Sequence, residues 1–112
     1  MSKNHLYKGT LSAVLLTLLE ENGRMYGYEL SKCALEATNG DLNITEGALY
    51  PALHKLEAEG LLETEMERVG NRMRKYYRLT ETGGKEARDR IAELADYAAN
   101  LQLFLKNRLA NG

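Results

Sequence analysis

The chain has 112 residues, a formal net charge of −1 and one cysteine, with 44% hydrophobic and 28% charged residues. This length predicts one small core, thin enough to gain from a partner subunit. The longest apolar run, 13–16, is far shorter than the roughly 20 residues that span a bilayer, and the N-terminal region lacks the layout of a signal peptide. We therefore expect a cytoplasmic protein. Cys33, His5 and His54 lack the spacing of a zinc site, so neither a metal nor another cofactor is expected.

Apolar spacing predicts two helices in the first third of the chain. The first covers 10–21 and ends at Asn22-Gly23, and the second, shorter one covers 26–38 and ends at Asn39-Gly40. Their inward stripes are Leu11, Val14, Leu15, Leu18 and Leu19 in the first helix, and Tyr26, Leu30, Cys33, Ala34 and Ala37 in the second.

A third helix is predicted from the N-cap Thr45 to Gly60, with Ile44 and Leu49 placed as a hydrophobic staple. Pro51 stands at the sixth helical position, where it removes one backbone hydrogen bond, so we expect a mild kink. Leu49, Leu53 and Leu56 face the core, whereas Thr45, Gly47, Tyr50, Pro51, His54 and Lys55 lie largely away from it.

From Leu61 the hydrophobic period changes from about 3.6 to 2, which predicts a β-hairpin. If Gly70-Asn71 is a two-residue type II′ loop, cross-strand positions sum to 141. Leu62 then faces Leu79 on a mainly apolar side. Glutamates face arginines on the other side, in the pairs Glu63–Arg78 and Glu67–Arg74. A one-residue slip would destroy both patterns.

A last helix is predicted after the cap Thr80. Its apolar residues are spaced 4, 3, 4, 3, 4, which is typical of a coiled-coil seam that needs a facing helix. We expect the same helix of a second subunit, and the alternative partner is the chain's own first helix. The chain thus divides into a winged-helix domain, 1–79, and a dimerisation helix packed on it, 80–112. The seam consists of Ala87, Ile91, Leu94, Ala98, Leu101 and Leu105.

This order of elements predicts a mainly α fold with a small β-hairpin, a winged helix-turn-helix. The net charge alone argues against nucleic acid, but residues 68–78 carry five cations and no acid, whereas 57–67 carry five acids and no cation. A basic hairpin tip can enter the minor groove of DNA. The alternative without a binding function is a solvated hairpin whose arginines pair with its glutamates. That alternative leaves Arg68, Arg72 and Lys75 without an acid opposite.

The outward side of the third helix suits the major groove. Thr45, Tyr50 and Lys55 can donate to phosphate, Gly47 permits close approach, and His54 can reach a base edge. Read singly, His54 is equally well a solvated surface histidine and Tyr50 a half-buried core residue.

Three stretches closely resemble the PadR-like family of transcriptional regulators. They are MYGYEL at 25–30, ITEGALYPALHKLEAEGLLE at 44–63 and RKYYRLTETG at 74–83. The resemblance implies a homodimeric winged-helix repressor that reads a palindromic operator in double-stranded DNA. It also implies that Pro51 is normal at its place in the recognition helix. The DNA-contacting residues would be Thr45, Gly47, Tyr50, Pro51, His54, Lys55, Arg68, Gly70, Asn71, Arg72, Arg74 and Lys75.

Some short members of this family bind flat hydrophobic molecules between subunits through an aromatic residue of the last helix. The chain has no Trp, so only Tyr97 and Phe104 can supply such a ring. An aromatic effector is therefore a further possible partner.

The residues also bear on two other classes of function. An enzyme is disfavoured, since the sequence shows no paired carboxylate motif, phosphate loop or nucleophile elbow. A winged-helix adaptor that binds protein rather than DNA remains an alternative, although it has no need for unpaired wing cations. Cys33 lies on an inner helical stripe, where a cysteine is usually a small hydrophobe rather than an oxidant sensor.

Overall fold

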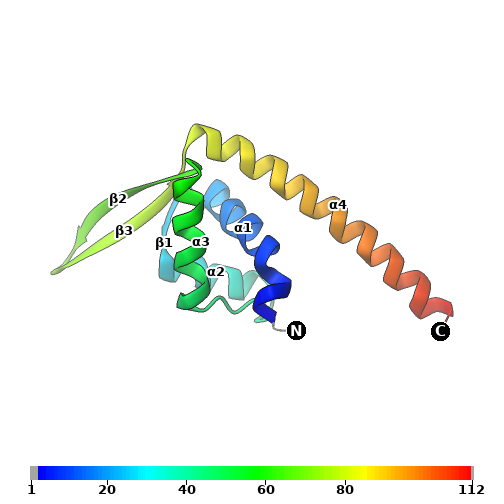
Figure 1. The fold of residues 1–112 in the computed structure, drawn as a ribbon. Coiled ribbons are helices and arrows are strands. Elements are labelled where there is room, and N and C mark those ends of the chain that lie inside the picture. Colours follow the sequence, from blue (N-terminus) through cyan, green and yellow to red (C-terminus); the bar gives the residue numbers. More distant parts are fainter. Residues whose placement is uncertain (1–2, 112) are drawn as a thin grey trace.

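The computed structural model describes the backbone of residues 3–111 and the side chains of residues 9–110, so His5 lies outside the described side chains (Figure 1). The sheet is antiparallel with strand order β1-β3-β2. The fold is mainly helical with this small sheet, as predicted. The elements are α1 (Lys3–Asn22), β1 (Arg24–Tyr26), α2 (Gly27–Ala37), α3 (Glu46–Ala58), β2 (Leu62–Val69), β3 (Arg72–Leu79) and α4 (Glu81–Asn111).

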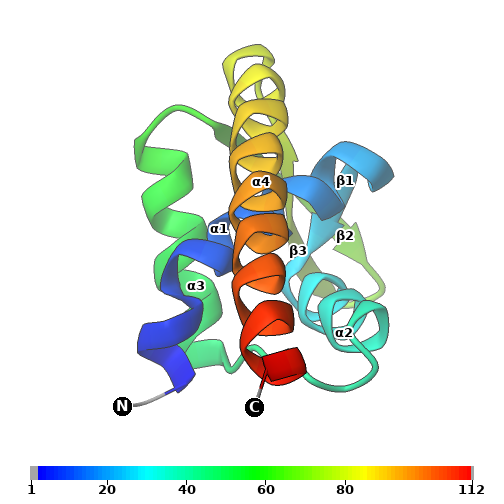
Figure 2. The same ribbon diagram turned by 90° about the vertical axis from the view of Figure 1, so that its right-hand side faces the viewer.

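Helix α1 lies at the centre of the molecule. No residue from 10 to 19 is exposed, and Leu15 and Leu16 are completely buried. The helix packs against α2, α3 and α4 and against β1 and β3. Figure 2 shows α4 crossing in front of α1, with α3 on one side and α2 on the other. The single predicted stripe omitted Leu16 because a helix covered on several sides buries residues all round.

Strand β1 was not predicted. The sequence pattern places Tyr26 in the second helix, but residues 24–26 are extended and pair with β3, with Met25 opposite Tyr77 and Tyr26 opposite Tyr76. Helix α2 begins only at Gly27, and the Tyr26 N–H donates to Glu29 Oε1 at 3.1 Å. Ala37, also placed inward from sequence, is exposed in the last turn.

The hairpin register is confirmed. Leu62 lies opposite Leu79 and Val69 opposite Arg72, so the pairs do sum to 141. Gly70 has φ of 63°, and Asn71 is not in the left-handed region, as a type II′ loop requires. The apolar face is buried only at its root, because Leu62 and Tyr77 are 3% and 2% exposed whereas Met66 is 57% exposed.

Helix α4 begins on the predicted cap, where the Gly83 N–H donates to Thr80 Oγ1 at 2.9 Å. Its first half packs against α1, and Ala87 is completely buried there. From Ala95 to Ala110 every residue is exposed, and Figure 1 shows this half projecting beyond the body. The alternative partner named above, the chain's own first helix, thus covers the start of the predicted seam.

We expect Leu16→Ala to lower the free energy of unfolding by about 2–5 kcal/mol, because it leaves a cavity in the enclosed centre of the fold. Chemical denaturation followed by circular dichroism measures this loss. Leu103→Ala in α4 is the matched control, since Leu103 is 58% exposed and its change should stay within about 0.5 kcal/mol. Equal losses for the two variants would contradict the central position of α1.

Candidate nucleic-acid interface

Helix α3 places its two faces as predicted. Leu49, Leu53 and Leu56 are at most 2% exposed, and Ile44 is buried beside them. The helix continues through Pro51 without a break. Thr45 is the N-cap residue, but its hydroxyl makes no capping hydrogen bond. Its carbonyl instead accepts from the N–H groups of Ala48 and Leu49. The six outward residues, Thr45, Gly47, Tyr50, Pro51, His54 and Lys55, are all exposed.

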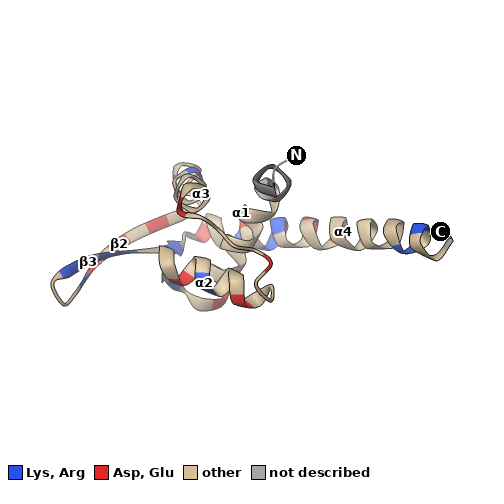
Figure 3. Ribbon diagram, turned by 90° about the horizontal axis from the view of Figure 1, so that it is seen from below, with Lys and Arg blue, Asp and Glu red and all other residues tan. Residues whose placement is uncertain are grey.

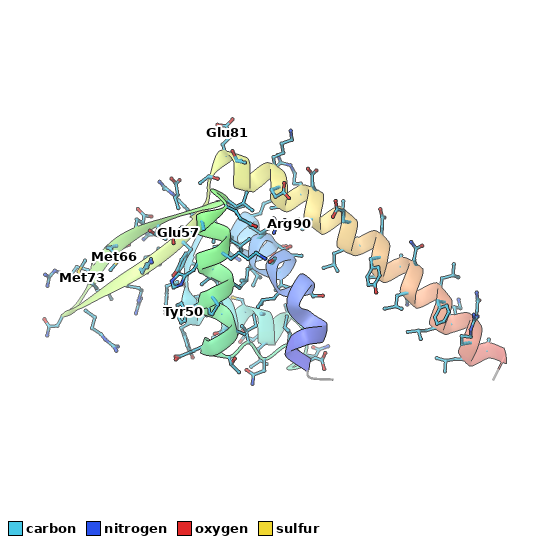
Figure 4. All side chains as sticks on the ribbon, viewed as in Figure 1. Tyr50, Glu57, Met66, Met73, Glu81 and Arg90 are labelled. Atoms are coloured by element: carbon cyan, nitrogen blue, oxygen red, sulfur yellow. The ribbon has the colours of Figure 1, made fainter. Side chains whose placement is uncertain are left out.

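Tyr50 is both exposed and packed. Its side chain is 37% exposed, and its ring lies against Gly27, the first residue of α2. A Cβ added at Gly27 would stand 2.9 Å from Tyr50 Cζ, closer than real contacts allow. Figure 4 labels Tyr50 on the side of α3 toward the hairpin. The interpretation of Tyr50 as a half-buried residue therefore applies to its ring. The contact also fixes α3 against α2.

The hairpin cations separate into paired and unpaired groups. Arg78 Nε donates to Glu63 Oε1 at 3.0 Å, as predicted. Arg68, Arg72 and Lys75 are exposed and form no ion pair with any side chain of residues 9–110. Figure 3 shows basic residues along β3 toward the tip and acidic residues along β2. Three unpaired positive charges thus lie on the outer hairpin.

Glu67 lies opposite Arg74 in the strand register, as predicted, but the two side chains form no ion pair with each other. Glu67 is bound instead by Arg24 of β1, which also donates to Glu65 at 2.9 Å. These hydrogen bonds, the one to Glu65 foremost, raise the pKa of Arg24 above its ordinary value. The Arg74 guanidinium lies over the Tyr26 ring at 4.1 Å from its centroid. The ion pair does not form because β1, which the sequence did not predict, brings both Arg24 and Tyr26 beside the hairpin.

Tyr50 of α3 and the hairpin meet at a hollow of about 360 Å³. Burial raises the pKa of Tyr77 in its wall, so this phenol stays neutral at ordinary pH. Lys75 Nζ lies 5.4 Å from the Tyr77 ring centroid. Three cations and hydroxyl donors around one hollow form a surface suited to an anion such as a backbone phosphate. The lining includes Gly27, Tyr50, Tyr77, Arg72, Arg74 and Lys75.

The remaining predicted residues lie on α4, away from this hollow. Ile91 and Leu94 are half-buried beside α1, whereas Ala98, Leu101 and Leu105 are exposed. Tyr97 and Phe104 are 66% and 51% exposed. A second hollow, of about 630 Å³, lies between α1 and α4 and has Tyr97 on its edge.

Within the described residues, no group of three His, Cys, Asp or Glu side chains is placed to hold a metal ion. In the same part of the chain, no helix combines the length and the apolar character needed to cross a membrane.

Three stacked helices followed by a basic hairpin define a winged helix-turn-helix protein. Residues 15–89 match the transcriptional regulator PadR-like family. The chain therefore belongs to the PadR-like family of transcriptional regulators. Because the members of this family are regulators, an enzymatic function is set aside.

Individual relatives agree with this assignment. A transcriptional regulator of Mycobacterium tuberculosis is 41% identical over 63 residues, which cover 54% of this chain and 59% of that protein. The crystal structure of a PadR family regulator from Eggerthella lenta is 33% identical, with a TM-score of 0.74 over 90% of this chain and 86% of that one. Bacillus subtilis PadR, solved in complex with operator DNA, is 29% identical, with a TM-score of 0.63 over 70% of this chain and 45% of that one.

We expect Gly27→Ala to lower the free energy of unfolding by about 1–3 kcal/mol, because the new methyl group overlaps the Tyr50 ring. The loss should shrink by at least about 1 kcal/mol in a Tyr50→Ala background, which a double-mutant denaturation cycle measures. Gly47→Ala in α3 is the control. The nearest atom there is 3.9 Å away, so alanine should stabilise the helix by up to about 1 kcal/mol. An additive cycle would contradict the proposed contact.

Proposed function

We propose that this regulator is a homodimeric repressor that binds a palindromic operator, with α3 in the major groove and the β2–β3 hairpin as a basic wing. One observation carries the proposal. Tyr50, on the exposed face of α3, and the unpaired cations Arg72 and Lys75 line the same hollow. The relative from Bacillus subtilis, solved with operator DNA, supports this use of the fold. An adaptor that binds protein would not need this positive charge.

The residues of α3 divide by chemistry. Thr45 and Lys55 would donate to phosphates, together with the free N–H groups of the exposed helix N-terminus. Gly47, with no side chain, lets the backbone approach closely. His54 would read a base edge. Tyr50 would offer its hydroxyl to a phosphate while its ring holds α3 in place, and Pro51 completes the outward face.

The wing would follow the phosphate backbone into the minor groove, where negative potential attracts arginine. Gly70 forms the tight loop with Asn71, and both are exposed. The cations of this surface are Arg68, Arg72, Arg74 and Lys75.

The projecting half of α4 would form the dimer. Ala98, Leu101 and Leu105 expose an apolar face that one chain leaves uncovered. A mostly apolar groove of about 250 Å³ lies beside it on the body and would take part of the partner helix. Two α3 helices joined in this way should read half-sites about one turn of DNA, ~34 Å, apart. The groove is lined by Val14, Thr17, Ala34, Ala37, Ile91 and Leu94, among others.

We place an aromatic effector at the same helix. Tyr97 and Phe104 are exposed one above the other along α4, and Tyr97 borders the 630 Å³ hollow. A flat hydrophobic molecule stacked on either ring between subunits would change the dimer geometry and release the operator. As a DNA-binding regulator, the protein would act in the cytoplasm.

Replacing Arg72 and Lys75 together by Ala should weaken operator binding and make the salt dependence shallower by roughly two units, since about 0.9 counterion is released for each phosphate contact. Gel shifts at several salt concentrations with the DNA upstream of the protein's own gene measure both effects. Lys85→Ala with Arg88→Ala removes the same charges from α4 and should leave the slope unchanged. Unaltered low-salt binding by the wing variant would exclude the basic wing.

Leu101→Asp with Leu105→Asp should convert the dimer to monomer, because two charges would be buried in the seam. Sedimentation velocity measures the change, and circular dichroism shows whether α4 persists. Ala99→Asp with Leu103→Asp adds the same charges on the opposite side of the helix and should leave the dimer intact. A dimer that survives the seam substitutions would show that subunits meet elsewhere.

A further inference from the structure

The outer half of the hairpin has no support from the hydrophobic core. No residue from Met66 to Met73 is buried, and Met66 and Met73, labelled in Figure 4, are more than half exposed. An isolated two-stranded hairpin is only marginally stable in water. The direction of the wing relative to α3 must therefore be fixed where the hairpin joins the body.

Arg24 makes a contact that reaches from the body to the outer part of the wing. It lies on β1, opposite Arg78 of β3, yet its guanidinium crosses β3 to β2. Nη1 donates to Glu65 at 2.9 Å and Nη2 donates to Glu67, so one side chain holds two carboxylates on the same face of β2. Glu67 is only two residues from Val69, where the strand ends.

Aromatic rings fix the path of this side chain. The Arg24 guanidinium lies over the Tyr76 ring at 4.1 Å, and Arg74 lies over the Tyr26 ring at the same distance. The two rings meet edge to face at 5.6 Å. Each strand thus places an arginine on the tyrosine of the other. Since Tyr26 is also the N-cap of α2, these contacts connect the hairpin to the helical body.

We propose that Arg24 is a positioning residue for DNA binding: by bridging β1 to Glu65 and Glu67 across β3, it fixes the angle between the basic wing and α3. It also neutralises two acids that would otherwise repel the phosphates beside the wing. The effect on DNA binding rests on the function proposed above, whereas the effect on wing order does not.

Two simpler roles for Arg24 make different predictions. An exposed ion pair without a positioning role would contribute little to stability or to DNA affinity. A direct phosphate ligand would contribute one unit to the salt slope. The acids separate the alternatives more sharply. If only net charge matters, removing Glu65 and Glu67 strengthens DNA binding, but if they anchor the wing, removing them weakens it.

The experiment compares two pairs of variants in the full chain. Arg24→Gln is matched by Arg78→Gln, which removes the same charge from the same face but breaks only the pair with Glu63 inside the hairpin. Glu65→Ala with Glu67→Ala is matched by Glu63→Ala. Gel shifts with the operator measure affinity at several salt concentrations, and hydrogen exchange of residues 68–73 in the free protein measures wing order.

We expect Arg24→Gln to weaken operator binding roughly three- to tenfold, the cost of ordering a loosened hairpin on DNA. The salt slope should stay unchanged, and exchange at 68–73 should become faster. The Glu65 and Glu67 double variant should weaken binding likewise. Arg78→Gln should bind as wild type, and Glu63→Ala should bind as wild type or slightly more tightly. Arg24→Lys should not restore binding, because one ammonium cannot span two carboxylates as the guanidinium fork does. The melting temperatures should stay within roughly 4 °C of wild type.

Several results would overturn the proposal. Full binding by Arg24→Lys would assign the effect to charge alone, and a slope shallower by one unit for Arg24→Gln would make Arg24 a phosphate ligand. Tighter binding after removal of Glu65 and Glu67 would show that these acids only repel DNA and do not anchor the wing. If the wild type binds no DNA, the proposed function fails, but hydrogen exchange still tests whether Arg24 orders the wing. Unchanged exchange at 68–73 in Arg24→Gln would exclude that role.

Discussion

Burial of helix α1 is the constraint on which the other elements depend. In a chain whose last helix projects half its length into solvent, α1 is the element around which α2, α3, α4 and the sheet can all pack. Leu15, Leu16 and Leu19 supply its buried surface. Because α3 buries its leucines against this same core, its opposite face must lie outside. The outward residues of α3 are thus held on a rigid support although they contribute nothing to the core.

The hairpin is held by a different kind of interaction. Apolar burial ends at Leu62 and Tyr77, and beyond them the strands are held by their own ladder and by contacts of charged groups with carboxylates and rings. Such exposed contacts add little to global stability. They restrict direction instead, which is what a surface that must meet a groove at a defined angle requires. Because the core and the outer hairpin are held by different interactions, the wing can be basic without destabilising the fold.

The register of the hairpin could be predicted from sequence because three signals agreed: the Gly70-Asn71 loop, the period of two and the complementary charges. Strand β1 could not be predicted, since three residues with one buried side chain carry no periodicity and Tyr26 also fits the helical spacing of α2. The contacts of Arg24 were missed for the same reason. The structure shows an exposed, buried and half-buried pattern for Arg24, Met25 and Tyr26 directly after the turn at Gly23, but three residues of sequence do not reveal it.

The seam of α4 shows what periodicity leaves undetermined. A heptad pattern identifies the face that needs a partner, but it does not say whether the partner is α1 or a second α4. Ala87 packs inside the chain, whereas Leu101 does not. The start of α4 is also tied to the end of α3. Arg90 donates to Glu86 at 3.0 Å and to Glu59, the C-cap of α3, at 3.3 Å. One continuous helix therefore joins the exposed seam to the end of α3, so in the proposed dimer the angle at which a second subunit packs on Leu101 would also set how far apart two α3 helices stand.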